Sequence, residues 1–407
     1  MTEISLSRVS GGAEPHQRLS PRVRFCLLAS ITLSFLAGSS VPTPIYPIYQ
    51  SAWHFSAVVI TIIFSVYALS VLAALLVFGR VSDYIGRRPV LLVTTAMQVV
   101  AMYSLGTASG LGELIAGRVL QGLSTGAAVS AVGAGLIQLH AQRGAIANAI
   151  APVSGSAIGA LLGSVMVQFV PFPTHTVFAV LAGILIVQFI GLVLLRDTQP
   201  ARPGALRSLV PQFSVPTQVR SAMLIAASVF IAGWAVAGFY ASLGPALIKH
   251  VFEVSSSSIG GLALATFSGS GVAAILALRS RSARTFAWVG SLALMIGMVT
   301  VLISLQFKSF AFFFYGIGIA GMGFGAGFQG GIRMVVAAAA PVELAGVLSV
   351  SFLCCYLGMG VPAIAAGYEV AKGADIMVTA QLFGAVIVML AALAVVGLIW
   401  TQAVKVG

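Results

Sequence analysis

The chain has 407 residues, of which 59% are hydrophobic and 7% are charged. Soluble domains carry about a quarter charged residues, so this composition excludes a soluble globular protein. The formal net charge is +12, but the basic residues lie in short loops and not on one face of a folded domain, which argues against nucleic acid as a partner. The sequence therefore predicts an all-α integral membrane protein surrounded by the lipid bilayer.

The N-terminal stretch, residues 1–24, is polar and basic, and no small-residue cleavage site follows a short apolar region. We expect it to be a cytoplasmic tail, followed by a first helix that is retained as an anchor. At about 20 apolar residues per span, the neutral runs predict twelve transmembrane helices. These lie near residues 25–46, 57–79, 89–109, 111–138, 144–169, 175–195, 221–248, 256–278, 285–305, 309–336, 342–368 and 376–402.

The basic residues predict the orientation of these helices. With the N-terminus in the cytoplasm, sixteen Lys and Arg residues fall on the inner side, and three, Lys249, Lys308 and Lys372, fall on the outer side. The positive-inside rule favours this orientation over its inverse. Both termini, including the short tail 403–407, are then cytoplasmic, and the expected location is a bacterial inner membrane.

The twelve helices are predicted to form two related halves. The polar, proline-rich stretch 196–220 indicates a cytoplasmic linker between a six-helix bundle at 25–195 and a second one at 221–402. A shift of 199 residues aligns basic and glycine positions of the two halves, so we expect the bundles to be pseudo-symmetric. The aligned pairs are Arg80 with Arg279, Gly117 with Gly316, Gly122 with Gly321, Gly126 with Gly325 and Gly159 with Gly358.

A dense charge cluster, GRVSDYIGRR, separates the second and third predicted helices. Its notable residues are Gly79, Asp83, Gly86, Arg87 and Arg88. Burying charge in hydrocarbon costs several kcal/mol per residue, so the cluster must be a tight loop between spans. The form Gly-x-x-x-Asp-x-x-Gly-Arg-Arg resembles the cytoplasmic signature between helices 2 and 3 of the major facilitator superfamily of secondary transporters. The resemblance implies two pseudo-symmetric six-helix bundles with a substrate site between them near the membrane midplane.

The resemblance also implies a role for the carboxylate of this loop. In an outward-open state Asp83 would lie against the N-terminus of the eleventh helix, near Pro341 and Val342, where the helix dipole favours an anion. The contact would break when the halves separate on the inner side. The alternative is a solvated turn residue that only orients the loop, with Arg87 and Arg88 following the positive-inside rule.

The fourth predicted helix carries a buried cation. Arg118 lies within an apolar run, where an unpaired guanidinium must face a partner or a wet cavity. Arg118, Gln121 and Gly122 match the Arg-x-x-Gln-Gly signature of the superfamily's efflux members, which implies a role in proton coupling or in organising the cavity. A structural clasp to backbone carbonyls of helix 1 or 2 is the alternative. Glu113, at the outer end of the same helix, is expected to be a surface end cap.

The fifth predicted helix carries a glycine motif. Gly155, Gly159 and Gly163 are similar to the antiporter signature Gly-x-x-x-Gly-Pro-x-x-Gly-Gly, with Ala160 in place of the proline and Ser164 in place of the last glycine. Together with the preceding motifs, this favours the twelve-helix drug/proton antiporter type.

Aromatic and amide residues of helices 1, 4, 7 and 10 are the candidate substrate contacts, because these helices line the cavity if the fold is right. For any one aromatic residue, core packing or a place in the interfacial belt is an alternative role. Besides Gln121, the candidates are Tyr46, Tyr49, Trp234, Phe239, Tyr240, Phe324, Phe328 and Gln329.

Several kinds of chemistry lack a signal in the sequence. Helices 1, 2, 5, 7, 8 and 10 contain no acidic residue, so a cationic substrate has no evident counter-ion, and a neutral or anionic amphipathic substrate is favoured. The three cysteines and five histidines have no neighbours at metal-site or catalytic spacing, and no Gly-x-x-x-x-Gly-Lys loop is present. We therefore expect no metal, no cofactor and no enzyme activity.

The sequence thus predicts a secondary active transporter, expected to be monomeric, that moves a small amphipathic molecule by alternating access. Efflux in exchange for protons is the favoured mode. An uptake carrier or uniporter for a sugar or an organic acid is the alternative, and a transport-dead membrane sensor or assembly partner is a remote one.

Overall fold

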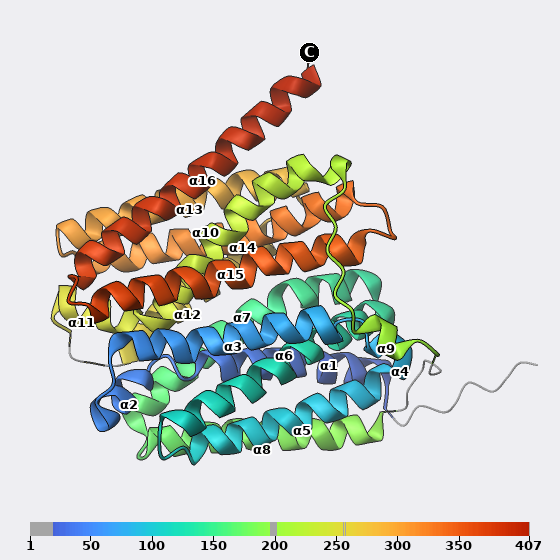
Figure 1. Ribbon diagram of the computed structural model, residues 1–407, viewed down its shortest axis with the longest axis horizontal. Coiled ribbons are helices and arrows are strands. Elements are labelled where there is room, and N and C mark those ends of the chain that lie inside the picture. The colour runs from blue at the N-terminus through green and yellow to red at the C-terminus, as the bar shows by residue number, and fades with distance from the viewer. Residues whose placement is uncertain (1–18, 196–201, 255, 257, 407) are drawn as a thin grey trace, which may run out of the picture.

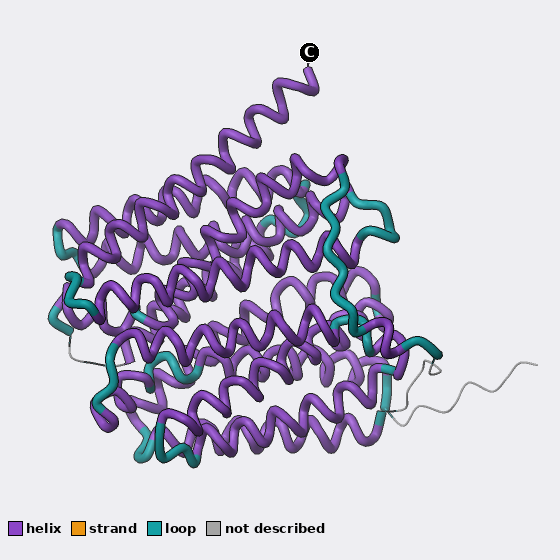
Figure 2. The backbone as a smooth tube through the Cα atoms, viewed as in Figure 1, coloured by secondary structure: helices purple, strands orange, loops and turns teal. Residues whose placement is uncertain are grey.

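The computed structural model describes residues 19–195, 202–254, 256 and 258–406. In this part of the chain all regular structure is helical, and twelve helices are long and apolar enough to cross a membrane (Figures 1 and 2). The prediction of an all-α membrane fold with twelve spans is confirmed for these residues.

The spanning helices follow one another in the predicted order. In the first half they are α1 (Pro21–Ser40), α3 (Ala57–Phe78), α5 (Arg87–Gly106), α6 (Leu111–Leu139), α7 (Ala141–Phe169) and α8 (Pro173–Leu194). In the second half they are α10 (Arg220–Ser242), α12 (Ser258–Ala277), α13 (Ala283–Gln306), α14 (Phe310–Ala338), α15 (Leu344–Ala371) and α16 (Ile376–Val406). The short elements are α2 (Tyr46–Trp53), α4 (Ser82–Ile85), α9 (Ala205–Ser208), α11 (Gly244–Phe252) and the 3₁₀ turn η1 (Thr217–Val219).

Helix boundaries differ from the expected ones at a few places. The first and seventh spans were expected to be continuous, but α1 is separated from α2, and α10 from α11. Pro42 and Pro44 lie in the first break, and Pro245 is the second residue of α11. Proline has no backbone N–H to donate to the preceding turn. At the chain ends, α1 already begins at Pro21, capped by Ser20, and α16 continues to Val406 through the expected tail.

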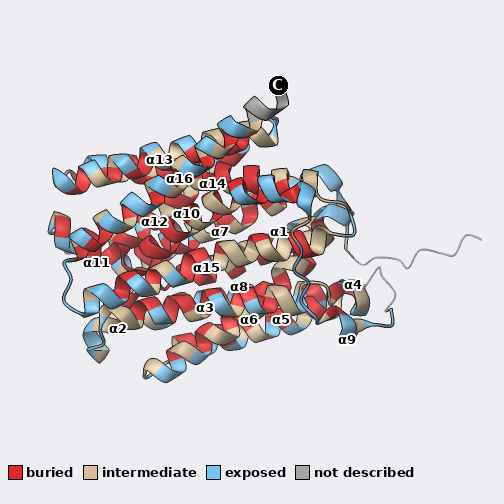
Figure 3. Cartoon of the chain, turned by 45° about the horizontal axis from the view of Figure 1, so that its top comes forward, coloured by how far each residue is buried: buried red, intermediate tan, exposed pale blue. Residues whose placement is uncertain are grey.

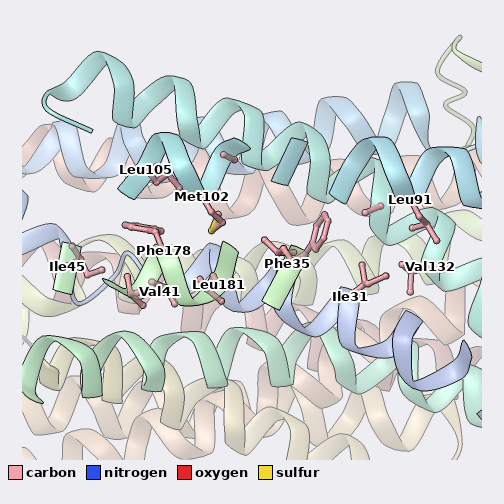
Figure 4. Packing of buried hydrophobic residues seen from close by; sticks show 14 of the residues in the cluster. Ile31, Phe35, Val41, Ile45, Leu91, Met102, Leu105, Val132, Phe178 and Leu181 are labelled. Atoms are coloured by element: carbon pink, nitrogen blue, oxygen red, sulfur yellow. The ribbon is translucent and has the colours of Figure 1, made fainter. Parts of the chain in front are cut away.

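The two sets of six helices pack as two bundles that lie side by side (Figure 1). Each bundle has a core of its own. In the first, Phe35 of α1, Met102 of α5 and Phe178 of α8 belong to one buried apolar cluster (Figure 4). Buried residues gather where helices face one another, and exposed apolar residues cover the periphery, as a lipid-facing surface requires (Figure 3).

Equivalent glycines bring equivalent helices together in the two halves. A Cβ on Gly122 of α6 would lie 2.5 Å from the Tyr67 carbonyl oxygen of α3, so only glycine allows this approach. In the second half Gly321 of α14 lies equally tightly against the Phe267 carbonyl oxygen of α12. The predicted shift of 199 residues therefore corresponds to a repeated helix contact.

Arginines at the same end of each bundle repeat a second contact. Arg88 of α5 donates to the carbonyls of Leu192 and Val193 at the end of α8, at 3.3 and 2.9 Å. Arg284 of α13 donates to the Leu398 carbonyl of α16 at 2.6 Å. We call this end of the molecule the basic end, and the other the opposite end.

Candidate substrate site and gate

The Arg118 side chain lies in the interior of the first bundle, with 0% of its surface exposed. Its Nη1 donates to the Ser39 carbonyl of α1 at 3.2 Å and to Gln121 Oε1 at 2.6 Å. Its Cζ lies 4.4 Å from the centroid of the Tyr67 ring of α3, a cation–π arrangement. Three helices therefore hold the guanidinium, and the clasp to a helix 1 carbonyl that was one expected role is present.

Much of the donor capacity around Arg118 remains unused. The Nε and Nη2 atoms of Arg118 and the Nε2 atom of Gln121 are buried without a hydrogen-bond partner. Gln98 of α5 is fully buried nearby, where its Oε1 accepts from Ser124, and its Nε2 also has no partner. The interior of this bundle thus presents several N–H groups that lack an acceptor.

No carboxylate is placed to neutralise this cation in the described part of the chain. Glu113, the nearest acid along α6, accepts from the Ser109 backbone N–H at 2.7 Å and so caps the start of the helix, as expected. The other described acidic residues lie in loops or close to helix ends: Asp83, Glu253, Glu343, Glu369 and Asp375.

Aromatic side chains of the second bundle form a cluster near the boundary between the halves. The ring centroid of Trp234 of α10 lies 4.9 Å from that of Tyr356 of α15. It lies 5.8 Å from the ring centroid of Phe328 and 6.0 Å from that of Phe324, both on α14. These four residues, which we call the aromatic wall, are all half-buried, whereas the indole Nε1 atom of Trp234 is buried without a partner. Trp234 and Tyr356 also pack in a cluster with Phe64 of α3, one turn from Tyr67.

The structure separates the remaining aromatic candidates from this wall. Phe239 packs on Phe383, with centroids 4.6 Å apart. Tyr240 lies against Phe267 and Phe313 inside the second bundle, and Phe267 stands between it and Phe324 of the wall. Tyr49 stacks on Trp53 within α2, and its hydroxyl donates to the Leu105 carbonyl of α5. Tyr49 therefore connects α2 to the rest of the first bundle. Tyr46 is buried with an unpartnered hydroxyl, and Gln329 is half-buried on α14.

The charged loop at the basic end forms a tight turn. Gly79 ends α3, and Gly86 has φ +92°, a conformation that favours glycine. Arg87 donates to Gln138 at the end of α6, and Arg88 donates to α8 as described above. The two arginines therefore connect neighbouring helices, in addition to following the positive-inside rule.

The predicted gate is not engaged in this arrangement. Asp83 is exposed, and Val342, the residue it was expected to approach, is 87% exposed. The start of α15 instead has an acid of its own, because Glu343 Oε2 accepts from the Ala340 N–H at 3.0 Å and from Gln218 Nε2 at 2.9 Å.

On the α3–α15 side of the interface, the halves contact each other between the midplane and the opposite end. Ser65 of α3 donates to the Gly360 carbonyl of α15 at 3.2 Å.

On the other side of the interface, Ser164 of α7 lies close against Gly261 of α12. The same side is also packed nearer the basic end, where Ala149 of α7 and Ile275 of α12 belong to one buried cluster. The exposed Asp83 is therefore not engaged with the start of α15, although α7 and α12 remain in contact toward this end.

The glycines of the fifth span join two helices of the same bundle. A Cβ on Gly155 would lie 2.5 Å from the Leu33 carbonyl oxygen. A Cβ on Gly163 would lie 2.6 Å from the Val41 carbonyl oxygen, and Gly159 lies equally close to Ala37. These glycines thus form a ladder along the α1–α7 contact.

The sequence analysis missed three residues around the site. Tyr67 and Tyr356 lie within apolar runs, where a tyrosine resembles any packing residue, and their partners are distant in the sequence. Gln98 offered a stronger signal, since it is an amide in the middle of a neutral span.

The fold and the buried polar site define a membrane transporter of the twelve-helix type. The family model of the Major Facilitator Superfamily matches residues 28–363. The chain belongs to this superfamily, whose members and fold are those of transporters and not of enzymes.

Individual proteins support the same classification. "Citrate exporter 1" of Aspergillus niger is 28% identical over 163 residues, which cover 39% of this chain and 31% of that protein. "Multidrug resistance protein MdtL" of Escherichia coli O6:K15:H31 (strain 536 / UPEC) is 32% identical over 153 residues, 35% of this chain and 38% of that protein. The matched regions therefore span only about a third of each relative's length. A crystal structure of the nucleoside transporter NupG aligns with TM-score 0.70 and 11% identity, over 93% of this chain and 100% of that one, which shows the fold alone.

Proposed function

We propose that the protein is a secondary active transporter that exports a small amphipathic molecule in exchange for protons, by alternating access between its two bundles. The similarity to a protein named as a citrate exporter and to one named for multidrug resistance supports the outward direction. The basic residues of the loops support a bacterial inner membrane with the basic end and both termini in the cytoplasm. The working unit is a monomer, because each chain contains both halves of the site.

The observation that carries this proposal is the state of Arg118. An ionised side chain in a membrane interior is expensive, and such residues mark substrate or ion pathways. Arg118 is fully buried, uses one of its three nitrogens in hydrogen bonds and retains two without an acceptor. A ligand that brings acceptor oxygens would complete this site. The absence of a described carboxylate near Arg118 favours a neutral or anionic substrate.

Asp83 and the loop around it form the gate in this proposal. When the basic end closes, Asp83 approaches the start of α15, where backbone N–H groups and the helix dipole favour an anion. Glu343 already accepts the Ala340 N–H there, so the arrival of Asp83 requires Glu343 to shift. The gate thus exchanges one carboxylate for another, which keeps its open and closed positions close in free energy.

A second candidate function is facilitated transport of an organic acid without protons. The observation in its favour is that the described spans contain no carboxylate in their central parts that could carry a proton. A membrane potential that is negative inside drives a monoanion outward with about 2.3 kcal/mol per 100 mV. Such a potential is enough to move an anionic substrate.

The test uses purified protein in liposomes that contain a pH-sensitive dye. Neutral, anionic and cationic amphiphiles are added in turn, and compound flux and proton flux are recorded together. Proton flux opposite to the flux of one compound supports the antiporter. Compound flux that follows an imposed potential without proton movement supports the second candidate. Folded protein that moves none of the three classes contradicts both.

A further inference from the structure

We propose that the substrate is an aromatic carboxylate, with its acid group bound at Arg118 and Gln121 and its ring against Trp234 and Tyr356. The inference rests on the proposed transport function and specifies the ligand of the same site. It assigns substrate contact to Tyr67 and Tyr356, two residues that the sequence motifs do not include.

The donor set around Arg118 fits a carboxylate. A guanidinium presents its N–H groups in a planar fork that matches two carboxylate oxygens, and here Nε and Nη2 lack acceptors. Gln121 Nε2 adds a third unused donor one turn along the same helix. A neutral alcohol or amide would leave the charge uncompensated, and a cation would be repelled.

The aromatic wall fits the other end of the same molecule. Its four rings are half-buried, so part of their surface is free to meet a ligand. The Trp234 ring is held edge-on by Phe324 and Phe328 and tilted against Tyr356. Aromatic ligands gain from edge and offset contacts of this kind beyond the area they bury. The unpartnered Trp234 Nε1 can also donate to a ring substituent.

Tyr67 connects the two regions. Its ring lies over the guanidinium of Arg118, and its neighbours on α3, Phe64 and Ala68, pack in one cluster with Trp234 and Tyr356. A ligand that approaches along the aromatic wall therefore meets Tyr67 before Arg118. Binding of the carboxylate requires the Tyr67 ring to move from the guanidinium, and the aromatic ring of the ligand offers it a new partner.

The two halves are asymmetric at these positions, which gives the ligand a direction. The internal repeat places Ile317 of α14 where the first half has Arg118, and Ala157 of α7 where the second half has Tyr356. One bundle thus supplies the charge and the other supplies the rings. A substrate with both groups bridges the halves, and its binding can be coupled to their relative movement.

The experiment measures binding of three probes to the full-length protein in detergent micelles. Naphthalene-2-carboxylate carries both groups, naphthalene-2-carboxamide lacks the charge, and cyclohexanecarboxylate lacks the aromatic ring. We expect naphthalene-2-carboxylate to bind about tenfold more tightly than either of the others, which corresponds to about 1.4 kcal/mol. Equal affinity of the carboxamide or of cyclohexanecarboxylate overturns the proposal, and so does failure of naphthalene-2-carboxylate to bind.

Variants assign each preference to a half of the site. Trp234→Leu should bind naphthalene-2-carboxylate no more tightly than cyclohexanecarboxylate, but still more tightly than the carboxamide. Arg118→Gln should lose the preference for the carboxylate over the carboxamide and keep the preference for the aromatic ring. Trp400→Leu, on the exposed surface of α16, and Arg333→Gln, whose guanidinium lies over Phe286 near the basic end, are the matched controls. An unchanged ring preference in Trp234→Leu overturns the proposal, and this result is decisive even if Arg118→Gln fails to fold.

The binding experiment and the transport experiment can fail independently. Export of a compound that lacks an acid group or an aromatic ring, without competition from naphthalene-2-carboxylate, supports the transporter and overturns this inference. Binding of naphthalene-2-carboxylate with the expected preferences, but without flux in liposomes, supports the inference and contradicts the transport function.

Discussion

The guanidinium of Arg118 is stacked on the ring of Tyr67, with 4.4 Å between Cζ and the ring centroid. The pair joins α6 to α3, and Gly122 makes it possible, because its missing side chain lets α6 approach the Tyr67 backbone. Gly122 of the Arg-x-x-Gln-Gly motif therefore helps to position Arg118 of the same motif against Tyr67. The stacking also substitutes for part of the hydration that Arg118 loses on burial.

The first prediction concerns this ring. Tyr67→Leu removes the π-face and should lower the free energy of unfolding by about 2 kcal/mol or more, the magnitude for a desolvated cation–π contact. Tyr67→Phe keeps the face and loses only the hydroxyl, which hydrogen-bonds with Ser39 and Thr125, so its loss should be smaller than that of Tyr67→Leu. Thermal unfolding in detergent compares the two, with Tyr103→Leu on the exposed surface of α5 as the control. Equal losses in Tyr67→Leu and Tyr67→Phe would contradict a role for the ring face.

The second prediction concerns the cation itself. Arg118→Lys keeps the charge but loses the planar fork, and we expect transport of the substrate found in the liposome screen to fall about tenfold or more. Arg118→Ala should lose the substrate or proton response entirely. Glu113→Gln, which changes a charge five residues away that serves only as a cap, is the matched control and should transport normally. Wild-type turnover in Arg118→Ala would reduce Arg118 to a structural residue.

The sequence allowed the helices and the position of Arg118 to be predicted, because both depend on local patterns. Uninterrupted neutral runs indicate spans, and a charge within one of them indicates burial. The aromatic wall was only partly predictable. Trp234, Phe324 and Phe328 could be placed on cavity helices, but Tyr356 could not, because its contact with Trp234 depends on how α15 packs against α10. The breaks after α1 and α10 were missed because proline is tolerated in membrane helices often enough to leave both outcomes open.

The third prediction concerns the gate at the basic end. Asp83 is exposed here and has no described partner, so Asp83→Asn should leave the unfolding temperature and substrate affinity unchanged. The variant loses the charge that the start of α15 attracts in the closed position, so we expect transport to slow. Affinity in micelles and flux in liposomes separate the two effects.

The control for the gate is Glu343→Gln, which removes the carboxylate that already accepts the Ala340 N–H. Glutamine can still accept this hydrogen bond, and Asp83 would no longer meet a like charge. We therefore expect flux equal to or faster than wild type. Equal slowing in Asp83→Asn and Glu343→Gln would show that any change of charge in this region disturbs the cycle, and would remove the specific role of Asp83.

The fourth prediction concerns the glycine ladder between α1 and α7. Gly159→Leu must push the Ala37 backbone away, because even a Cβ at this position collides with it. We expect a lower unfolding temperature and poor recovery of folded protein. Gly183→Leu is the matched control, since a Cβ there meets nothing within 4 Å and the side chain would face lipid. A Gly159→Leu variant as stable as Gly183→Leu would contradict the close packing of α1 and α7.

The fifth prediction tests whether the halves must separate near Ser65 and Gly360 during transport. An ideal Cβ on Gly360 lies 3.6 Å from the Ser65 Cβ, which is within the range for a disulfide. In a background in which the three native cysteines are replaced, Ser65→Cys combined with Gly360→Cys should therefore oxidise readily and join α3 to α15. If access alternates by movement of the bundles, the cross-linked protein cannot open at the opposite end, so flux should stop and return on reduction. The two single variants are the controls. Full flux in quantitatively cross-linked protein would show that this contact persists throughout the cycle and would contradict rocking of the halves about the site.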